Sequence, residues 1–142
     1  MNTDDSALTV GEIGELGLLE RIHRFCPMEI VGDDAALVSI PAEQLLVVTN
    51  DVLVDGVHFS DKTTTAEDVG WRAAAASLSD LAAMGAQPRG ITVGLGISSD
   101  LPVAWIESLY EGLRQCLDRY NSLLLGGDVC RSRVITVSIT AL

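Results

Sequence analysis

One segment of this chain, residues 65–85, constrains the fold more than any other. It is rich in alanine and leucine, which favour helix, and four consecutive alanines occupy positions 73–76. Thr65 is placed to cap the first turn, with Asp68 three residues later, and Gly85 is placed to end the helix. Small side chains let a helix approach its neighbours closely, so the segment predicts a helix packed against a sheet.

Apolar periodicity on both sides of this segment predicts the other elements. Apolar residues recur at helical spacing over residues 12–25 and 101–120, with Asp100 as a cap for the second helix. Short apolar runs too brief for helices predict buried strands at 45–49 and 122–125, and a further short strand after a turn at 31–34. Alternation predicts two more strands, at 90–97 and 134–142.

The order of these elements indicates an α/β (α+β) domain with a mixed sheet of about four main strands and helices packed on one face. The last predicted strand places Ile135, Val137 and Ile139 on one side and Thr136 and Ser138 on the other. Its polar side carries no charge, which suits a barrel lining or a subunit contact better than open water. The whole chain, residues 1–142, is predicted to be one domain.

Composition excludes several classes of protein. Twenty acidic residues against nine lysines and arginines give a net charge of −11, so the chain offers no basic stripe for nucleic acid. It has no apolar run of the roughly 18 residues that a membrane span requires, and its first residues are polar and acidic, so a cytoplasmic location is expected. The three cysteines lack C-x-x-C spacing, which indicates neither a disulfide framework nor a zinc site.

Aspartates occur at four places that border the predicted core. Asp33 and Asp34 precede an apolar run, Asp51 follows a predicted strand, and Asp128 lies behind two glycines. Asp80 projects from an apolar face of the alanine-rich helix, where an isolated buried carboxylate would need a partner. Each has a structural explanation by itself: a turn, a strand-end cap, a second turn and a salt bridge, respectively. Together they predict a cluster of carboxylates.

Carboxylate oxygens without cysteine or paired histidine select hard cations such as Mg²⁺ or Mn²⁺. Mg²⁺ shares its coordination shell with phosphates and water, so such a cluster suits several ions that bridge a polyphosphate. Gly126 and Gly127 would let the backbone approach that phosphate. The chain has no G-x-x-x-x-G-K-[ST] sequence, which excludes a P-loop enzyme.

Several motifs, in this order and at suitable spacing, resemble the thiamine-monophosphate kinase family. The resemblance runs from about residue 11 to the end, and its most specific part is the S-D-L-A-A-M-G-A segment together with V-H-F. The motifs are Gly14-Glu15-Leu16, Gly32-Asp33-Asp34-Ala35-Ala36, Thr49-Asn50-Asp51, Val54-Asp55-Gly56-Val57-His58-Phe59, Ser77-Leu78-Ser79-Asp80-Leu81-Ala82-Ala83-Met84-Gly85-Ala86 and Gly126-Gly127-Asp128.

The resemblance implies a fold shared with aminoimidazole ribonucleotide synthetase and selenophosphate synthetase, in which N-terminal sheets pair into a barrel across a homodimer. It implies in-line transfer of the γ-phosphate of ATP to thiamine monophosphate, without a covalent enzyme intermediate. His58 would contact thiamine monophosphate, and Gly127 with Asp128 would contact ATP. Several Mg²⁺ ions would be bound by Asp34, Thr49, Asn50, Asp51, Asp80 and Asp128.

The chain departs from the family at three points. Asn50 and Val129 stand where the family usually has threonine. Family members are also considerably longer, and their second domain, which supplies further contacts to ATP and thiamine, is absent from these 142 residues. We therefore expect little or no kinase activity from this chain alone. Two alternatives stay open: another ATP-dependent synthetase of the superfamily, and a non-catalytic fragment that binds metal or dimerises.

Overall fold

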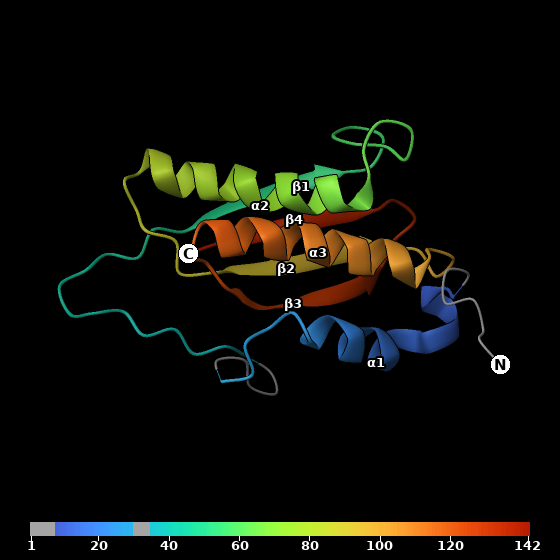
Figure 1. Ribbon diagram of the computed structural model, residues 1–142, viewed down its shortest axis with the longest axis horizontal. Coiled ribbons are helices and arrows are strands. Elements are labelled where there is room, and N and C mark those ends of the chain that lie inside the picture. The colour runs from blue at the N-terminus through green and yellow to red at the C-terminus, as the bar shows by residue number, and fades with distance from the viewer. Residues whose placement is uncertain (1–7, 30–34) are drawn as a thin grey trace.

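The computed structural model describes residues 8–29 and 35–142 (Figure 1). Within these ranges it contains three helices and four strands, which confirms the predicted α/β class. In chain order they are α1 (Val10–His23), β1 (Thr49–Val54), α2 (Ala66–Ala83), β2 (Ile91–Ile97), α3 (Val103–Arg119), β3 (Leu124–Arg131) and β4 (Thr136–Ala141). No helix among the described residues is long and apolar enough to cross a membrane.

The four strands form one mixed sheet in the order β1-β4-β2-β3. The central strand β4 is antiparallel to both neighbours, whereas β2 and β3 are parallel. Helices α2 and α3 lie together across one face, and α1 lies toward the β3 edge (Figure 1). We call the face under α2 and α3 the covered face, and the opposite one the open face.

Two glycines set the close approach of α2 to α3. A Cβ atom at Gly70 would lie 2.0 Å from the carbonyl oxygen of Leu109, and one at Gly112 would lie 1.9 Å from that of Glu67. Neither position can accept a side chain without separating the two helices. The alanines at 73–76 were predicted to permit close packing against the sheet, and Ala73 and Ala74 are fully buried, whereas the close approach to α3 is made at glycine.

The helix boundaries follow the sequence signals closely for α2 and less so for the other helices. Thr65 caps α2 by accepting a hydrogen bond from the Asp68 amide, and Gly85 follows the helix with a φ of +68°, as predicted. The N-cap position of α3 is Pro102 and not Asp100, and no side chain caps this helix. Helix α1 is interrupted at Gly14, where φ is +68° and the backbone is not helical.

Two predicted strands are wrong in extent. The apolar run 45–49 was predicted to be a buried strand, yet β1 begins only at Thr49, and Leu45 is 95% exposed. Length and composition signalled a strand, but of residues 45–48 only Val47 packs against the described core. The predicted strand 122–125 continues through Gly126-Gly127-Asp128 to Arg131, because β3 pairs with β2 along its whole length. Residues 35–38 of the predicted strand after the turn form no extended strand.

Candidate functional site

Two carboxylates of the predicted cluster lie where β1 faces α2. The Thr49 hydroxyl donates a 2.8 Å hydrogen bond to Oδ2 of Asp80, and the Ser77 hydroxyl donates one of 2.8 Å to Oδ2 of Asp51. Thr49 and Asp51 are two residues apart on one face of β1, and Ser77 and Asp80 are three residues apart on α2. The strand and the helix therefore hold both aspartates side by side; we call these four residues the β1–α2 cluster.

The aspartates of the β1–α2 cluster have hydroxyl partners and no cationic ones. In the described part of the chain, the ion pairs formed by arginines engage Glu107, Glu111 and Asp118, and none involves Asp51 or Asp80. Asp51 is half-buried, but Asp80 is exposed, so the prediction of a buried Asp80 carboxylate is wrong. Asp80 lies near the C-terminal end of α2, where the helix extends past the start of β1 and leaves the carboxylate open to solvent.

Asn50 lies between these residues in sequence but faces the other way. Its side-chain amide donates to the Ser138 hydroxyl at 3.2 Å, the Ile139 carbonyl at 3.0 Å and the Thr140 hydroxyl at 3.0 Å. Strand alternation places it on the open face, opposite Thr49 and Asp51. Its side-chain oxygen is the only atom of the amide left for a ligand.

Asp128 lies on β3, at the far edge of the sheet from β1. Two strands separate β1 from β3, which places them about 14 Å apart at the usual strand spacing. Asp128 is in register with Gly94, and Gly94 with Ser138, so it belongs to the open face. Asp128 and the β1–α2 cluster are thus on different faces of the sheet, and no single ion reaches both.

The glycines before Asp128 have structural roles of their own. A Cβ atom at Gly127 would lie 1.9 Å from the Val93 carbonyl oxygen, so pairing with β2 requires glycine there. Gly126 has a φ of +129° beside a register shift between β2 and β3, with open space around its Cα. Of the two, Gly126 is the one whose surroundings leave room for a ligand.

Asp34 lies outside the described residues, so its position relative to the cluster stays a prediction. Within the described ranges, no group of three or more histidine, cysteine, aspartate or glutamate side chains is arranged to hold a metal ion. The β1–α2 cluster contributes two carboxylates, and its other oxygens come from Thr49 and Ser77. Two carboxylates are what Mg²⁺ usually takes from a protein when phosphates and water complete its shell.

His58 lies on a compact turn that follows β1. Its Nδ1 accepts a 3.0 Å hydrogen bond from the Val54 amide, and its own amide donates to the Val54 carbonyl at 2.9 Å. Phe59, next in sequence, is buried and stacks on Trp105 with ring centres 6.4 Å apart. The imidazole is therefore held at the surface by a buried neighbour.

Ser77 and Arg72 were not identified from the sequence. Ser77 is fully buried and lies one helical turn before Asp80, a spacing that could have indicated it as a partner for a second carboxylate. Arg72 donates to the carbonyl oxygen of His58, fourteen residues earlier in the chain. No local pattern indicates that contact, because it depends on how the turn packs against α2.

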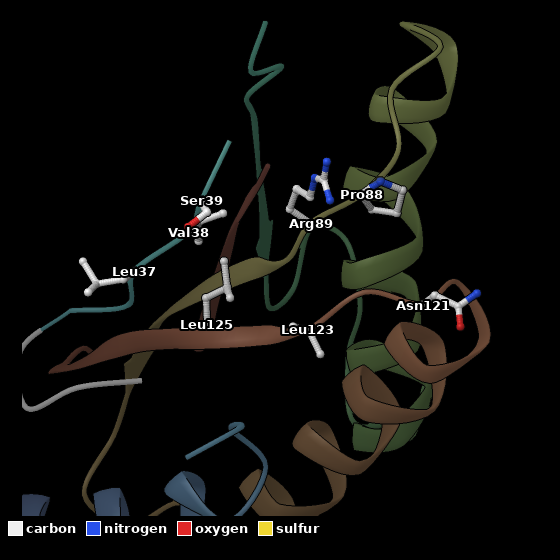
Figure 2. Close-up of a pocket in the computed structure, with 8 residues that line it drawn as sticks. All are labelled: Leu37, Val38, Ser39, Pro88, Arg89, Asn121, Leu123 and Leu125. Atoms are coloured by element: carbon white, nitrogen blue, oxygen red, sulfur yellow. The ribbon is translucent and has the colours of Figure 1, made fainter. Parts of the chain in front are cut away.

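A cavity beside the start of β3 is lined, among the described residues, by none of the predicted site residues. Figure 2 shows it between the 37–39 segment, the 88–89 segment and the start of β3. Its described walls are mainly apolar, with Arg89 as the charged residue among them. The site is therefore defined by hydrogen-bonded carboxylates and not by this cavity.

The chain is similar in sequence to known proteins over most of its length. A family model described as "AIR synthase related protein, N-terminal domain" matches residues 32–142. Thiamine-monophosphate kinase from Synechococcus elongatus is 53% identical over 134 residues, which cover 94% of this chain and 41% of that protein. The enzyme from Escherichia coli K12 is 44% identical over 101 residues, which cover 71% of this chain and 30% of that enzyme. The chain thus spans less than half the length of these relatives.

Solved structures show the same relationship in three dimensions. Thiamine-monophosphate kinase from Stenotrophomonas maltophilia superposes with a TM-score of 0.74 at 40% identity, covering 87% of this chain and 40% of that one. A complex of AaThiL with AMPPCP and TMP superposes with a TM-score of 0.68 at 33% identity, over 92% of this chain and 41% of the other. The hydrogenase maturation protein HypE, at 17% identity and a TM-score of 0.71, shares the fold alone.

Proposed function

Because the chain belongs to the AIR synthase related family, as its N-terminal domain, we propose that it is the N-terminal part of a thiamine-monophosphate kinase. The reaction is transfer of the γ-phosphate of ATP to thiamine monophosphate, with thiamine diphosphate and ADP as products. The observation that carries the proposal is the β1–α2 cluster, two aspartates that have no cationic partner among the described residues, in a chain 53% identical to such a kinase.

The β1–α2 cluster is the proposed Mg²⁺ site of this domain. Asp51 and Asp80 supply carboxylates, and Thr49 supplies a hydroxyl already directed at Asp80. When bound, the ions neutralise the charge of the triphosphate, which is the main requirement of phosphoryl transfer. Asp34 and Asn50 are proposed as further ligands, Asn50 through its side-chain oxygen. Ser77 orients Asp51 through its hydrogen bond, so that the second carboxylate oxygen is left for the ion.

The remaining residues have proposed roles toward the two substrates. Asp128 and the backbone at Gly127 approach ATP from the open face, where Asp128 would hold a separate ion. His58 contacts the phosphate of thiamine monophosphate. A non-bridging oxygen of that phosphate attacks the γ-phosphorus, the bond from this phosphorus to the β-phosphate oxygen breaks, and ADP leaves. The protein supplies position and charge, and no enzyme atom forms a covalent bond.

The open face is the proposed homodimer contact. Thr136, Ser138 and Thr140 are half-buried there without any helix above them, and their hydroxyls carry no charge. Uncharged polar side chains of this kind can be buried against a second copy if their hydrogen bonds are satisfied. Such pairing would bring the sheets of two copies together as a barrel.

The proposal is tested with the full-length parent protein, ATP, Mg²⁺ and thiamine monophosphate, by chromatographic detection of thiamine diphosphate. We expect product from the wild type and a loss of kcat of at least about 100-fold in Asp51→Asn and Asp80→Asn. Glu20→Gln, an exposed α1 residue outside the site, is the matched control and keeps activity. Wild-type turnover on a different acceptor would replace the proposed substrate. Full activity in both aspartate variants would remove the metal site.

The fragment itself provides an independent measurement. Titration of this chain with Mg²⁺ and a nonhydrolysable ATP analogue, followed by calorimetry, is expected to show binding that Asp51→Asn weakens and Glu20→Gln does not. Identical binding by all three proteins would show that the β1–α2 cluster holds no ion in the isolated domain.

A further inference from the structure

Backbone hydrogen bonds cross-link the turn from Val54 to Phe59. The Gly56 amide donates to the Phe59 carbonyl at 2.8 Å, and the amides of Val57 and His58 both donate to the Val54 carbonyl. The Asp55 amide joins the turn to the sheet through the Ile135 carbonyl at 2.9 Å. These bonds hold the sheet side of the turn and leave the His58 carbonyl for a partner on the helix side.

The hydrogen bond to its ring fixes the chemical form of His58. A backbone amide can only donate, so Nδ1 must accept from Val54 and carries no proton. In the neutral ring the proton is then on Nε2, which has no hydrogen-bond partner among the described residues. The turn thus presents a single N–H donor to solvent, in a chain with a net charge of −11.

Arg72 connects this turn to α2. Its guanidinium Nη1 donates to the His58 carbonyl, and the preceding residue, Trp71, is half-buried against the core. The hydrogen bond closes the turn from the helix side, while Phe59 anchors it from the core side. Because the guanidinium is always charged, its hydrogen bond to the carbonyl is charge-assisted.

We propose that Arg72 is a positioning residue that holds the His58 ring in its Nε2–H form and directs that donor at a phosphate monoester. The identity of the ligand rests on the proposed function, whereas the link from Arg72 to the ring does not. Arg72 acts through the turn: without it the His58 carbonyl loses its partner, the turn opens at its helix side, and the bond from Val54 to Nδ1 is no longer maintained.

The first test uses NMR of this chain and needs no ligand. At about pH 8.5 we expect a ¹⁵N–¹⁵N coupling between the Val54 amide and Nδ1 of His58. Arg72→Gln is expected to remove the coupling and to speed hydrogen exchange of the Val54 amide about tenfold. Arg72→Lys, which can still donate to the carbonyl, is expected to restore most of the protection.

Controls separate this effect from a general loss of stability. The Val69 amide, bonded to the Thr65 carbonyl at 3.0 Å within α2, should exchange at the same rate in all variants. Arg89→Gln removes an arginine that lines the cavity of Figure 2 and should behave as wild type. An unchanged coupling and an unchanged Val54 exchange rate in Arg72→Gln would overturn the proposal, as would equal acceleration at Val54 and Val69.

The second test concerns the ligand and uses the full-length parent protein. Arg72→Gln is expected to raise KM for thiamine monophosphate about tenfold with little change in kcat or in KM for ATP, and Arg72→Lys is expected to lie between. Unchanged kinetics in Arg72→Gln, with normal wild-type turnover, would overturn the ligand assignment. Absence of turnover in the wild type would instead contradict the proposed function, while the NMR result would stand by itself.

Discussion

The two faces of the sheet are formed by the same strands but differ in what covers them. On the covered face, alternate residues such as Val93, Val137 and Ile139 are fully buried beneath α2 and α3. On the open face, their neighbours are threonine, serine and glycine, and Val52 is 45% exposed. The covered face supplies stability within the described chain, whereas the open face contributes little to it and is available for a ligand or a second copy.

The candidate site divides between these two faces. Asp51 lies on the covered face, against α2, and is held by a fully buried serine. Asn50 and Asp128 lie on the open face, and Asp128 is exposed. Changes on the covered face should therefore alter folding, and matched changes on the open face should leave folding intact while altering binding.

Thiol labelling should give the largest contrast. Cys26 and Cys116 are buried, and burial raises the pKa of both thiols, whereas Cys130 is exposed on the open-face side of β3. An aromatic disulfide reagent should modify one thiol of the native protein at least about 1,000-fold faster than the other two, which require local opening. Cys130→Ser should abolish the fast phase. Rapid labelling of two or more thiols in the native protein would show that the covered layer is open.

A pair of glycine substitutions should sharpen the comparison. Gly112→Ala forces a Cβ atom against the Glu67 carbonyl and should lower the free energy of unfolding by about 3 kcal/mol or more. Gly94→Ala, on the open face, brings its Cβ only within 3.6 Å of Ser138, which is ordinary contact, and should change stability by less than about 1 kcal/mol. Denaturant unfolding of both variants measures the difference. Equal effects would mean that the α2–α3 contact is not as close as described.

Two adjacent residues of β1 offer a similar test with a smaller effect. Leu53 is 5% exposed on the covered face, and Val52 is 45% exposed on the open face. Leu53→Ala should cost about 2–4 kcal/mol of unfolding free energy, and Val52→Ala less than about 1 kcal/mol in the separate chain. If a second copy covers the open face, the cost of Val52→Ala should increase with protein concentration, which thermal unfolding at several concentrations would reveal.

The smallest expected effect is a dependence of stability on alkaline pH. Burial among α1 and α3 side chains raises the pKa of Tyr110, and the proximity of Cys26 raises it further. In the unfolded chain a tyrosine ionises near pH 10, so the stabilisation is complete below that pH and is lost as the pH rises above it. Tyr110→Phe should therefore lose less stability than wild type between about pH 9 and 11. Parallel stability curves for the two proteins would contradict this burial.

The alternation of half-buried and buried residues in β4 could be predicted from the sequence, because it repeats every two residues. Strand 136–141 alternates in burial as its composition predicts, and α2 begins after Thr65 and ends before Gly85 as its capping residues indicate. These features depend on residues within a few positions of each other, so one stretch of sequence contains the whole signal.

The amino-acid sequence alone therefore determined the three helices, the alternation of the last strand and the identity of the acidic positions. Only the tertiary structure decided that Asp51 and Asp80 each accept a hydrogen bond from a hydroxyl across the β1–α2 contact. It also decided that Asp128 lies on another strand and face, and that Arg72 bonds to the turn of His58. The reason is that strand order and helix packing join residues distant in sequence. Neither periodicity nor residue spacing carries that information before the chain folds.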